Sequence, residues 1–157
     1  MADSGRTLRI GLWVGLVGSL TIWLYEYVLL YKLFHQGNDA AGVVQHAALL
    51  VFGPGMRSSG LPGFVLGLLI HCATGMVWGV VFAFIWQFLT KPRIEATLAA
   101  LLFGAIAWAV THLVVLAIFS TEPPVYTTYG VINGLTSHMV AFAVPMALTV
   151  KTLGRYR

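Results

Sequence analysis

The sequence carries very little charge. It has nine lysines and arginines and five acidic residues in 157 positions, so charged side chains make up only 9% of the chain. A soluble domain usually has about 25% charged residues. So few charges could not cover the surface of a soluble fold, which would then expose large apolar patches. The shortage excludes a soluble enzyme, a disordered chain, a collagen-like chain and a coiled coil, and it predicts one membrane domain over residues 1–157.

Cysteine and catalytic motifs are scarce as well. The single cysteine, Cys72, lies in an apolar run and cannot form a disulfide within the chain. The sequence has no G-x-S-x-G elbow, no phosphate-binding loop and no H-E-x-x-H metal motif. We therefore expect no enzymatic activity and assign no catalytic residue. The net charge of +4 is small and divided among short loops, so we expect no nucleic-acid partner.

Hydrophobic sequence is what the chain has in abundance, at 59% of its residues. A membrane-spanning helix needs about 20 mostly apolar residues. Short connections join the second segment to the third and the third to the fourth, so these neighbours should run antiparallel. The sequence predicts an all-α integral membrane protein, a four-helix transmembrane bundle in the lipid bilayer. The predicted spans are about 10–31, 61–89, 94–119 and 129–150.

The basic residues predict an orientation. With the N-terminus inside, seven of the nine lysines and arginines fall on the cytoplasmic side, and only Lys32 and Arg57 fall outside. An excess of basic residues marks the cytoplasmic loops of membrane proteins. We expect both termini in the cytoplasm. The first segment is too long for an ordinary signal peptide and no A-x-A cleavage site follows it, so we expect it to be retained as an anchor.

The long outer loop, residues 32–60, contains a further apolar stretch. Residues 40–52 are too few to span a bilayer. Asn38 or Asp39 is a candidate N-cap, and Gly53-Pro54-Gly55 should end the helix. The loop therefore predicts a short interfacial helix that lies at the outer membrane surface or dips back over the bundle.

Glycines recur at four-residue spacing within the spans. Small residues at this spacing let helix backbones approach closely in a membrane. The repeat in the second span includes His71, and the repeat in the fourth leads to His138. We therefore expect His71 at a contact between helices. The glycines assigned to helix packing are Gly63, Gly67, Gly75 and Gly79 in the second span and Gly130 and Gly134 in the fourth.

Each predicted span contains one ionisable group well inside it: Glu26, His71, His112 and His138. At 1.5 Å of rise per residue, they lie roughly 8 to 15 Å from the outer end of their spans. Ionisable groups inside a membrane are costly and usually face the bundle interior or a wet cavity. The four therefore predict a polar cluster in the outer half of the bundle. A purely structural role, hydrogen bonding between helices, is the alternative for each histidine.

Several of these residues also resemble a known family. Trp23-Leu24-Tyr25-Glu26 is followed by His71, a lysine-bearing loop, His112, Pro123-Pro124-Val125, His138 and a basic tail. This order is similar to that of the YagU-like bacterial inner-membrane proteins, a group without an agreed mechanism, and the similarity is greatest over residues 70–157. The resemblance implies a location in the bacterial inner membrane. It also implies that the four polar residues match family positions, and it implies no reaction.

Three classes of function stay open at this point. Histidine titrates near neutral pH, so the cluster favours a pH-responsive protein or proton-coupled transport. Imidazoles on facing helices also bind haem b or a transition metal, with His71, His112, His138 and Glu26 as candidate ligands. Thirdly, the glycine faces could pack in a homo-oligomer or dock on a partner's helices, which would make the chain an accessory subunit of a larger membrane complex.

Overall fold

The chain is all-α over the residues that the structure, a computed structural model, describes: 4–36, 39–89, 96–121 and 125–154. Within these ranges the segments are helices joined by short turns, and no strand is present. Some residues used in the sequence predictions lie outside the described ranges. These are Asn38, Lys91, Arg93, Glu95, Pro123, Pro124, Arg155 and Arg157.

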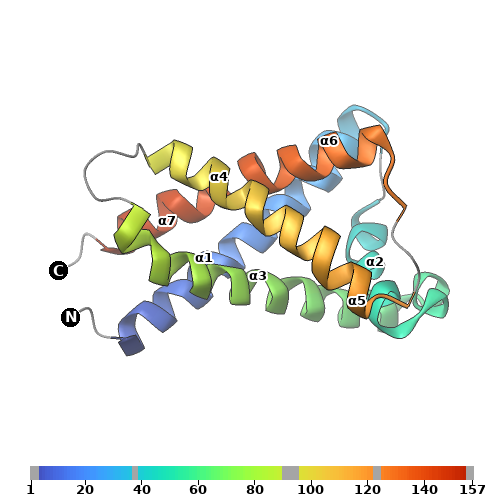
Figure 1. Ribbon diagram of the computed structural model, residues 1–157. Coiled ribbons are helices and arrows are strands. Elements are labelled where there is room, and N and C mark those ends of the chain that lie inside the picture. Colours follow the sequence, from blue (N-terminus) through green and yellow to red (C-terminus); the bar gives the residue numbers. More distant parts are fainter. Residues whose placement is uncertain (1–3, 37–38, 90–95, 122–124, 155–157) are drawn as a thin grey trace.

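Four long helices run the length of the molecule (Figure 1). All four are long and apolar enough to cross a membrane, which confirms the predicted class of protein. The first begins at Ser4, earlier than predicted, and the fourth continues to Leu153. In chain order they are α1 (Ser4–Leu24) with η1 (Tyr25–Leu33), then α3 (Leu61–Leu89), then α4 (Ala96–Ala109) with η3 (Val110–Val115) and α5 (Leu116–Phe119), then α6 (Thr128–Thr136) with η4 (Ser137–Ala143) and α7 (Val144–Gly154).

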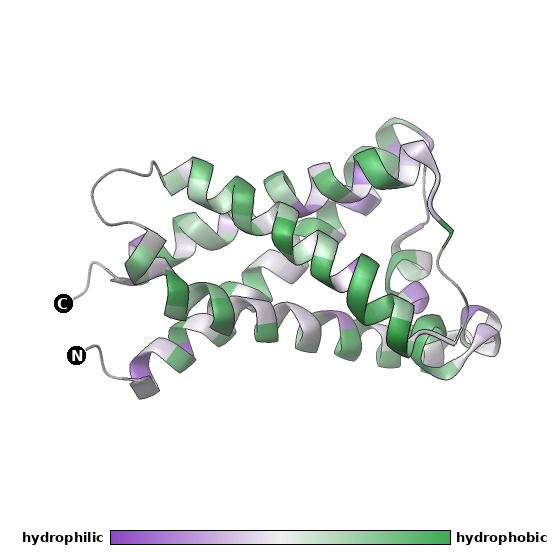
Figure 2. Cartoon of the chain, in the orientation of Figure 1, coloured by the Kyte–Doolittle hydropathy of each residue, from purple (hydrophilic) through white to green (hydrophobic). Residues whose placement is uncertain are grey.

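The outward surface of the bundle is apolar. Leu69, Val77 and Ile106 are 61%, 64% and 57% exposed. Figure 2 shows hydrophobic residues along the helices, with hydrophilic residues mainly near the two ends of the bundle. Large aliphatic side chains at this exposure suit lipid tails better than water, because apolar surface in water is unfavourable.

The short helix predicted in the long loop is present as α2 (Ala40–Phe52). The Asp39 side chain caps it by accepting a hydrogen bond from Gly42 N at 2.7 Å, and Gly53 ends it with φ of 95°. A short turn, η2 (Pro54–Ser58), then leads to α3. The start of α1 and the end of α7 lie at one end of the bundle, the terminal end, and α2 lies at the other, the α2 end (Figure 1).

Glycines place α1 directly against α3, which is the most extensive helix pair in the fold. A Cβ added to Gly15 would lie 2.6 Å from the Cα of Met76, and one added to Gly79 would collide with the backbone of Gly11 and Gly15. A Cβ on Gly75 would collide with the Ser19 hydroxyl. The two backbones therefore touch, and dispersion and weak backbone contacts hold them without bulky side chains between.

The other packing glycines have different neighbours. Gly67 faces the backbone of Val44 on α2, and Gly63 faces Met56 and Ser59 in the turn before α3. Gly134 faces the indole of Trp108 on α4. A Cβ on Gly130 would meet only the Thr127 hydroxyl that caps its own helix, at 3.1 Å. Gly130 is therefore placed at a helix start and makes no close contact with another helix.

Large side chains fill the terminal half of the bundle. Val14, Phe82 and Met146 are completely buried, and Phe103 is 4% exposed. The rings of Phe82 and Phe103 lie 4.7 Å apart, which joins α3 to α4 through an aromatic contact. This core closes the bundle between the terminal end and the site described next.

Gly75→Ala should destabilise the fold because the new methyl group meets the Ser19 hydroxyl and the Gly15 carbonyl. We expect the free energy of unfolding to fall by about 1–3 kcal/mol, although alanine is the better helix former. Reversible unfolding in lipid–SDS mixed micelles, followed by circular dichroism, measures the change. Gly55→Ala is the matched control, since nothing lies within 4 Å of that Cβ. Equal stability of the two variants would contradict the contact.

Candidate functional site

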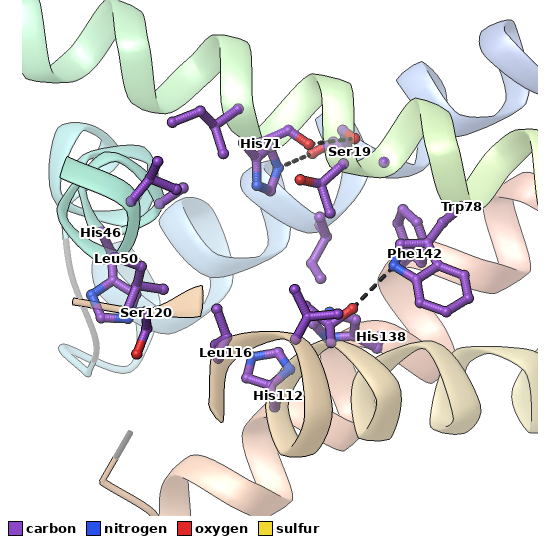
Figure 3. Close-up of a pocket in the computed structure, with 18 of the residues that line it drawn as sticks. Ser19, His46, Leu50, His71, Trp78, His112, Leu116, Ser120, His138 and Phe142 are labelled. Carbon is purple, nitrogen blue, oxygen red and sulfur yellow. Dashed lines mark hydrogen bonds between the residues drawn. The ribbon is translucent and has the colours of Figure 1, made fainter. Parts of the chain in front are cut away.

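A cavity of about 280 Å³ lies between the helices at the α2 end. Residues from α1, α2, α3, η3, α5 and η4 line it (Figure 3). Its walls are mainly apolar. The larger apolar side chains around it are Ile22, Leu50, Ile70, Trp78, Leu116, Phe119 and Phe142.

Four histidines line this cavity, each from a different segment (Figure 3). They are His46 of α2, His71 of α3, His112 of η3 and His138 of η4. No aspartate, glutamate, lysine or arginine is among the described residues that line it. The cavity is therefore an apolar site whose ionisable groups are all imidazoles.

His46 is not among the predicted site residues because it lies in the long outer loop and not in one of the four predicted spans. A signal for it does exist in the sequence. Val43, Ala47 and Leu50 stand three or four residues from His46 and also line the cavity. The apolar face of α2 therefore includes His46. The helical spacing of apolar residues in 40–52 indicates that His46 lies on the face that packs against the bundle.

Backbone carbonyls hold three of the four rings. His71 Nε2 lies 2.9 Å from the Ser19 carbonyl oxygen on α1. His112 Nδ1 lies 3.1 Å from the Trp108 oxygen, and His138 Nδ1 lies 2.8 Å from the Gly134 oxygen. A carbonyl oxygen only accepts, so each of these nitrogens carries the hydrogen and donates it. In the neutral ring the second nitrogen is then an acceptor: Nδ1 of His71 and Nε2 of His112 and His138.

Aromatic contacts fix the planes of two rings. His112 stacks on Trp108, and their ring centroids lie 5.2 Å apart. The His138 ring is nearly perpendicular to the His112 ring, with the centroids of these two rings 5.3 Å apart. Phe142 lies 5.9 Å from the other side of His138. The two histidines thus form one contiguous aromatic group between η3 and η4.

Three of the predicted polar residues lie on π-helical segments. Glu26 is on η1, His112 on η3 and His138 on η4, whereas His71 is on the uninterrupted α3. A π-helical segment adds a residue to a helical turn and changes the direction in which later side chains point. Such segments are rare and occur frequently at functional sites. This local geometry brings His112 and His138 together.

Pro145 leaves a backbone carbonyl without its usual partner at the end of η4. Proline has no N–H, so it cannot donate to the carbonyl of Ala141, four residues earlier. The Thr21 hydroxyl of α1 lies 2.6 Å from that oxygen and can donate to it. A threonine on a neighbouring helix therefore bonds to a carbonyl that proline cannot serve in the α-helical pattern, and it joins α1 to η4.

The cavity is closed toward the terminal end by Trp78. Its Nε1 donates to the Thr111 hydroxyl at 3.0 Å, which joins α3 to η3 (Figure 3). The Trp78 ring also packs edge-on against Phe103 of the core, at 5.8 Å. The hydrogen bond and the ring contact together separate the cavity from the packed half of the bundle.

Glu26 does not line the cavity. Its carboxylate accepts hydrogen bonds from Asn133 Nδ2 at 3.2 and 3.4 Å. The Ser137 hydroxyl is a second partner of Glu26 and lies 3.4 Å from His138 Nδ1. The structure therefore divides the four residues into three histidines around a cavity and a carboxylate bound to α6, with Ser137 between them.

The arrangement does not form the metal-ligand set considered from the sequence. In the described part of the chain, no group of three or more histidine, cysteine or acidic side chains is placed to hold a metal ion. The edge contact between His112 and His138 also leaves no space for a porphyrin between these two rings. The geometry therefore favours uses of the histidines other than joint ligation.

Comparison of the chain with known protein families, curated proteins and solved structures finds no match. The resemblance to the YagU-like proteins stays a prediction from the sequence.

Thr21→Val should weaken the attachment of η4 to α1. Valine has the shape of threonine and no hydroxyl, so the Ala141 carbonyl loses its donor inside an apolar bundle. We expect a loss of about 1–3 kcal/mol in the free energy of unfolding. Thr21→Ser, which keeps the hydroxyl, should retain most of the stability. Chemical denaturation of the two variants side by side in mixed micelles makes the comparison, and a Val variant as stable as the Ser variant would refute the role of Thr21.

Proposed function

We propose that the protein is a pH-responsive multi-pass protein of the bacterial inner membrane whose histidine-lined cavity faces the outer side. The observation that carries the proposal is the convergence of four imidazoles from four segments on one cavity. Histidine is the side chain whose ordinary titration falls in the physiological range. No carboxylate among the described lining residues offsets the positive charge that these rings would gain.

The distribution of basic residues supports the orientation. Arg6, Arg9 and Lys151 belong to the parts of α1 and α7 at the terminal end. Lys32 and Arg57 belong to η1 and η2, toward the α2 end. The excess at the terminal end is the pattern expected of a cytoplasmic side. The cavity then opens toward the outer half, where it would meet external protons.

Charge repulsion supplies a driving force for a change of shape. The His112 and His138 rings lie 5.3 Å apart. Two unit charges at that separation repel by about 3 kcal/mol at an effective dielectric constant of about 20. Such an energy is enough to shift a balance between two states of a helix bundle. Protonation of both rings should therefore favour a state in which η3 and η4, or the elements over them, move apart.

Other titratable groups near these rings modify the response. His71 and His46 face the same cavity and would add to the repulsion when protonated. Ser137 contacts both Glu26 and His138, so Glu26 is near His138 but outside the cavity. A negative charge on Glu26 would favour the protonated form of His138. Cys72 is adjacent to His71 in α3 but is not among the cavity residues. The Tyr126 hydroxyl donates to the His112 carbonyl.

The element most readily displaced is α2. The hydrogen bonds that join it to the rest of the described chain include one from the Thr121 hydroxyl to Leu49 O at 3.1 Å and three others to backbone carbonyls. Trp23 Nε1 donates to Ala40 O at 3.0 Å, Gln45 Nε2 donates to Gly60 O at 3.0 Å, and Thr121 N donates to Leu50 O at 2.9 Å. The terminal half has a continuous packed core instead. We therefore expect acidification to move α2 away from α5 and leave the terminal half in place.

The distance between α2 and α5 should increase on acidification from about pH 7.5 to about pH 4.5. Spin labels at Phe52→Cys and Ile118→Cys, in a Cys72→Ser background, report it by pulsed electron paramagnetic resonance in lipid nanodiscs. Both positions are well exposed, at 57% and 66%. The increase should be lost or much reduced in His112→Phe, which keeps a ring on Trp108 and removes the titrating group.

His35→Asn is the control for removal of a histidine outside the cavity. His35 is exposed and has a φ of 53°, a conformation that asparagine tolerates. It should leave the response unchanged. A constant distance in the parent protein, or an equal increase in His112→Phe, would rule the proposal out.

A further inference from the structure

We propose that the cavity binds a small uncharged aromatic molecule that carries a hydroxyl group, such as a phenol or a hydroquinone. The inference rests on the proposed function, since it assigns a ligand class to the same cavity and the same rings. Four features of the cavity lead to it: its hydrogen-bonding groups, its charge, its walls and its size.

The hydrogen-bonding groups call for a donor. His71, His112 and His138 each donate a ring N–H to a backbone carbonyl. The second nitrogen of each neutral ring is then an acceptor. The Trp78 N–H donates to the Thr111 hydroxyl, and the Ser19 hydroxyl can donate to Gly15 O at 3.0 Å. The three imidazoles therefore offer acceptors to a ligand, and a molecule with an O–H group can donate to them whereas an ether of the same shape cannot.

The charge of the cavity excludes strongly ionic ligands. A charged molecule in an apolar site needs a group of opposite charge to offset its lost hydration. The described lining residues include no carboxylate for a cation and no lysine or arginine for an anion. An uncharged molecule therefore fits best while the histidines are neutral.

The walls and the size favour a single ring. Aliphatic residues and the rings of Trp78 and Phe142 surround the space (Figure 3). A cavity of about 150 Å³ lined by leucine, isoleucine and phenylalanine is large enough for benzene. The cavity of about 280 Å³ therefore accommodates one substituted aromatic ring.

Protons and this ligand would compete for the same nitrogens. Protonation of His112 or His138 converts its acceptor nitrogen into a donor. The hydroxyl group then loses its partner, and the ring acquires a charge in the binding site. We therefore expect bound ligand to be released when the outer side is acidified, which couples ligand release to protonation.

Fluorine NMR with a matched pair of probes tests the ligand class. 4-Fluorophenol has the hydroxyl donor, and 4-fluoroanisole has a methyl ether in its place. In nanodiscs at about pH 7.5, 4-fluorophenol should bind saturably above the background of empty nanodiscs, and 4-fluoroanisole should bind about tenfold more weakly or not at all. This comparison uses the unaltered protein, so it does not depend on the folding of a variant.

Histidine variants and a lower pH test whether 4-fluorophenol binds in the cavity. His138→Phe and His112→Phe should each weaken 4-fluorophenol binding by about tenfold, and His35→Asn should not change it. Binding to the parent protein should fall by a similar factor at about pH 4.5. Absence of saturable binding, or equal affinity for the two probes, would overturn the ligand class. The spin-label distances are measured without ligand, so failure of the pH response would be seen separately.

Discussion

The close contact between α1 and α3 is the interaction on which the site depends. Gly11 and Gly15 of α1 meet Gly75 and Gly79 of α3 without side chains between the backbones. His71 stands one turn from Gly75, so this closeness brings its ring within 2.9 Å of the Ser19 carbonyl on the other helix. In a bilayer, where lipid tails are as apolar as leucine, such packing and the hydrogen bonds it permits hold helices together. The glycines therefore determine where one wall of the cavity lies.

The opposite wall of the cavity, formed by η3 and η4, depends on hydrogen bonds from side chains to backbone carbonyls inside the bundle. In η3 and η4 the histidine rings bond to carbonyls of their own helices, and Thr21 reaches Ala141 where Pro145 cannot donate. Each bond pairs a polar side chain with a backbone carbonyl inside an apolar bundle, where an unpaired polar group is costly. The same bonds fix the ring orientations. Stability of the distorted helices and placement of the acceptor nitrogens thus have one physical cause.

The sequence was informative where the signal is a local pattern. Long apolar runs predicted the four membrane helices, and Asp39 with Gly53 predicted the limits of α2. Depth along a span was less informative, because depth gives the height of a residue and not the side of the helix it faces. Glu26 has the depth of the histidines but turns toward Asn133, outside the cavity. The π-helical segments have no recognised sequence signature, and His46 lay outside the spans that were searched.

The bond from Trp78 to Thr111 has a consequence for passage through the molecule. Together with the Trp78–Phe103 contact it places the indole between the cavity and the packed core that contains Phe82 and Met146. Conduction across the bilayer would require the indole to swing out and the aromatic core to separate. The indole therefore connects the wall of the cavity to the packed core of the terminal half, so a change at either one acts on the other through a single side chain.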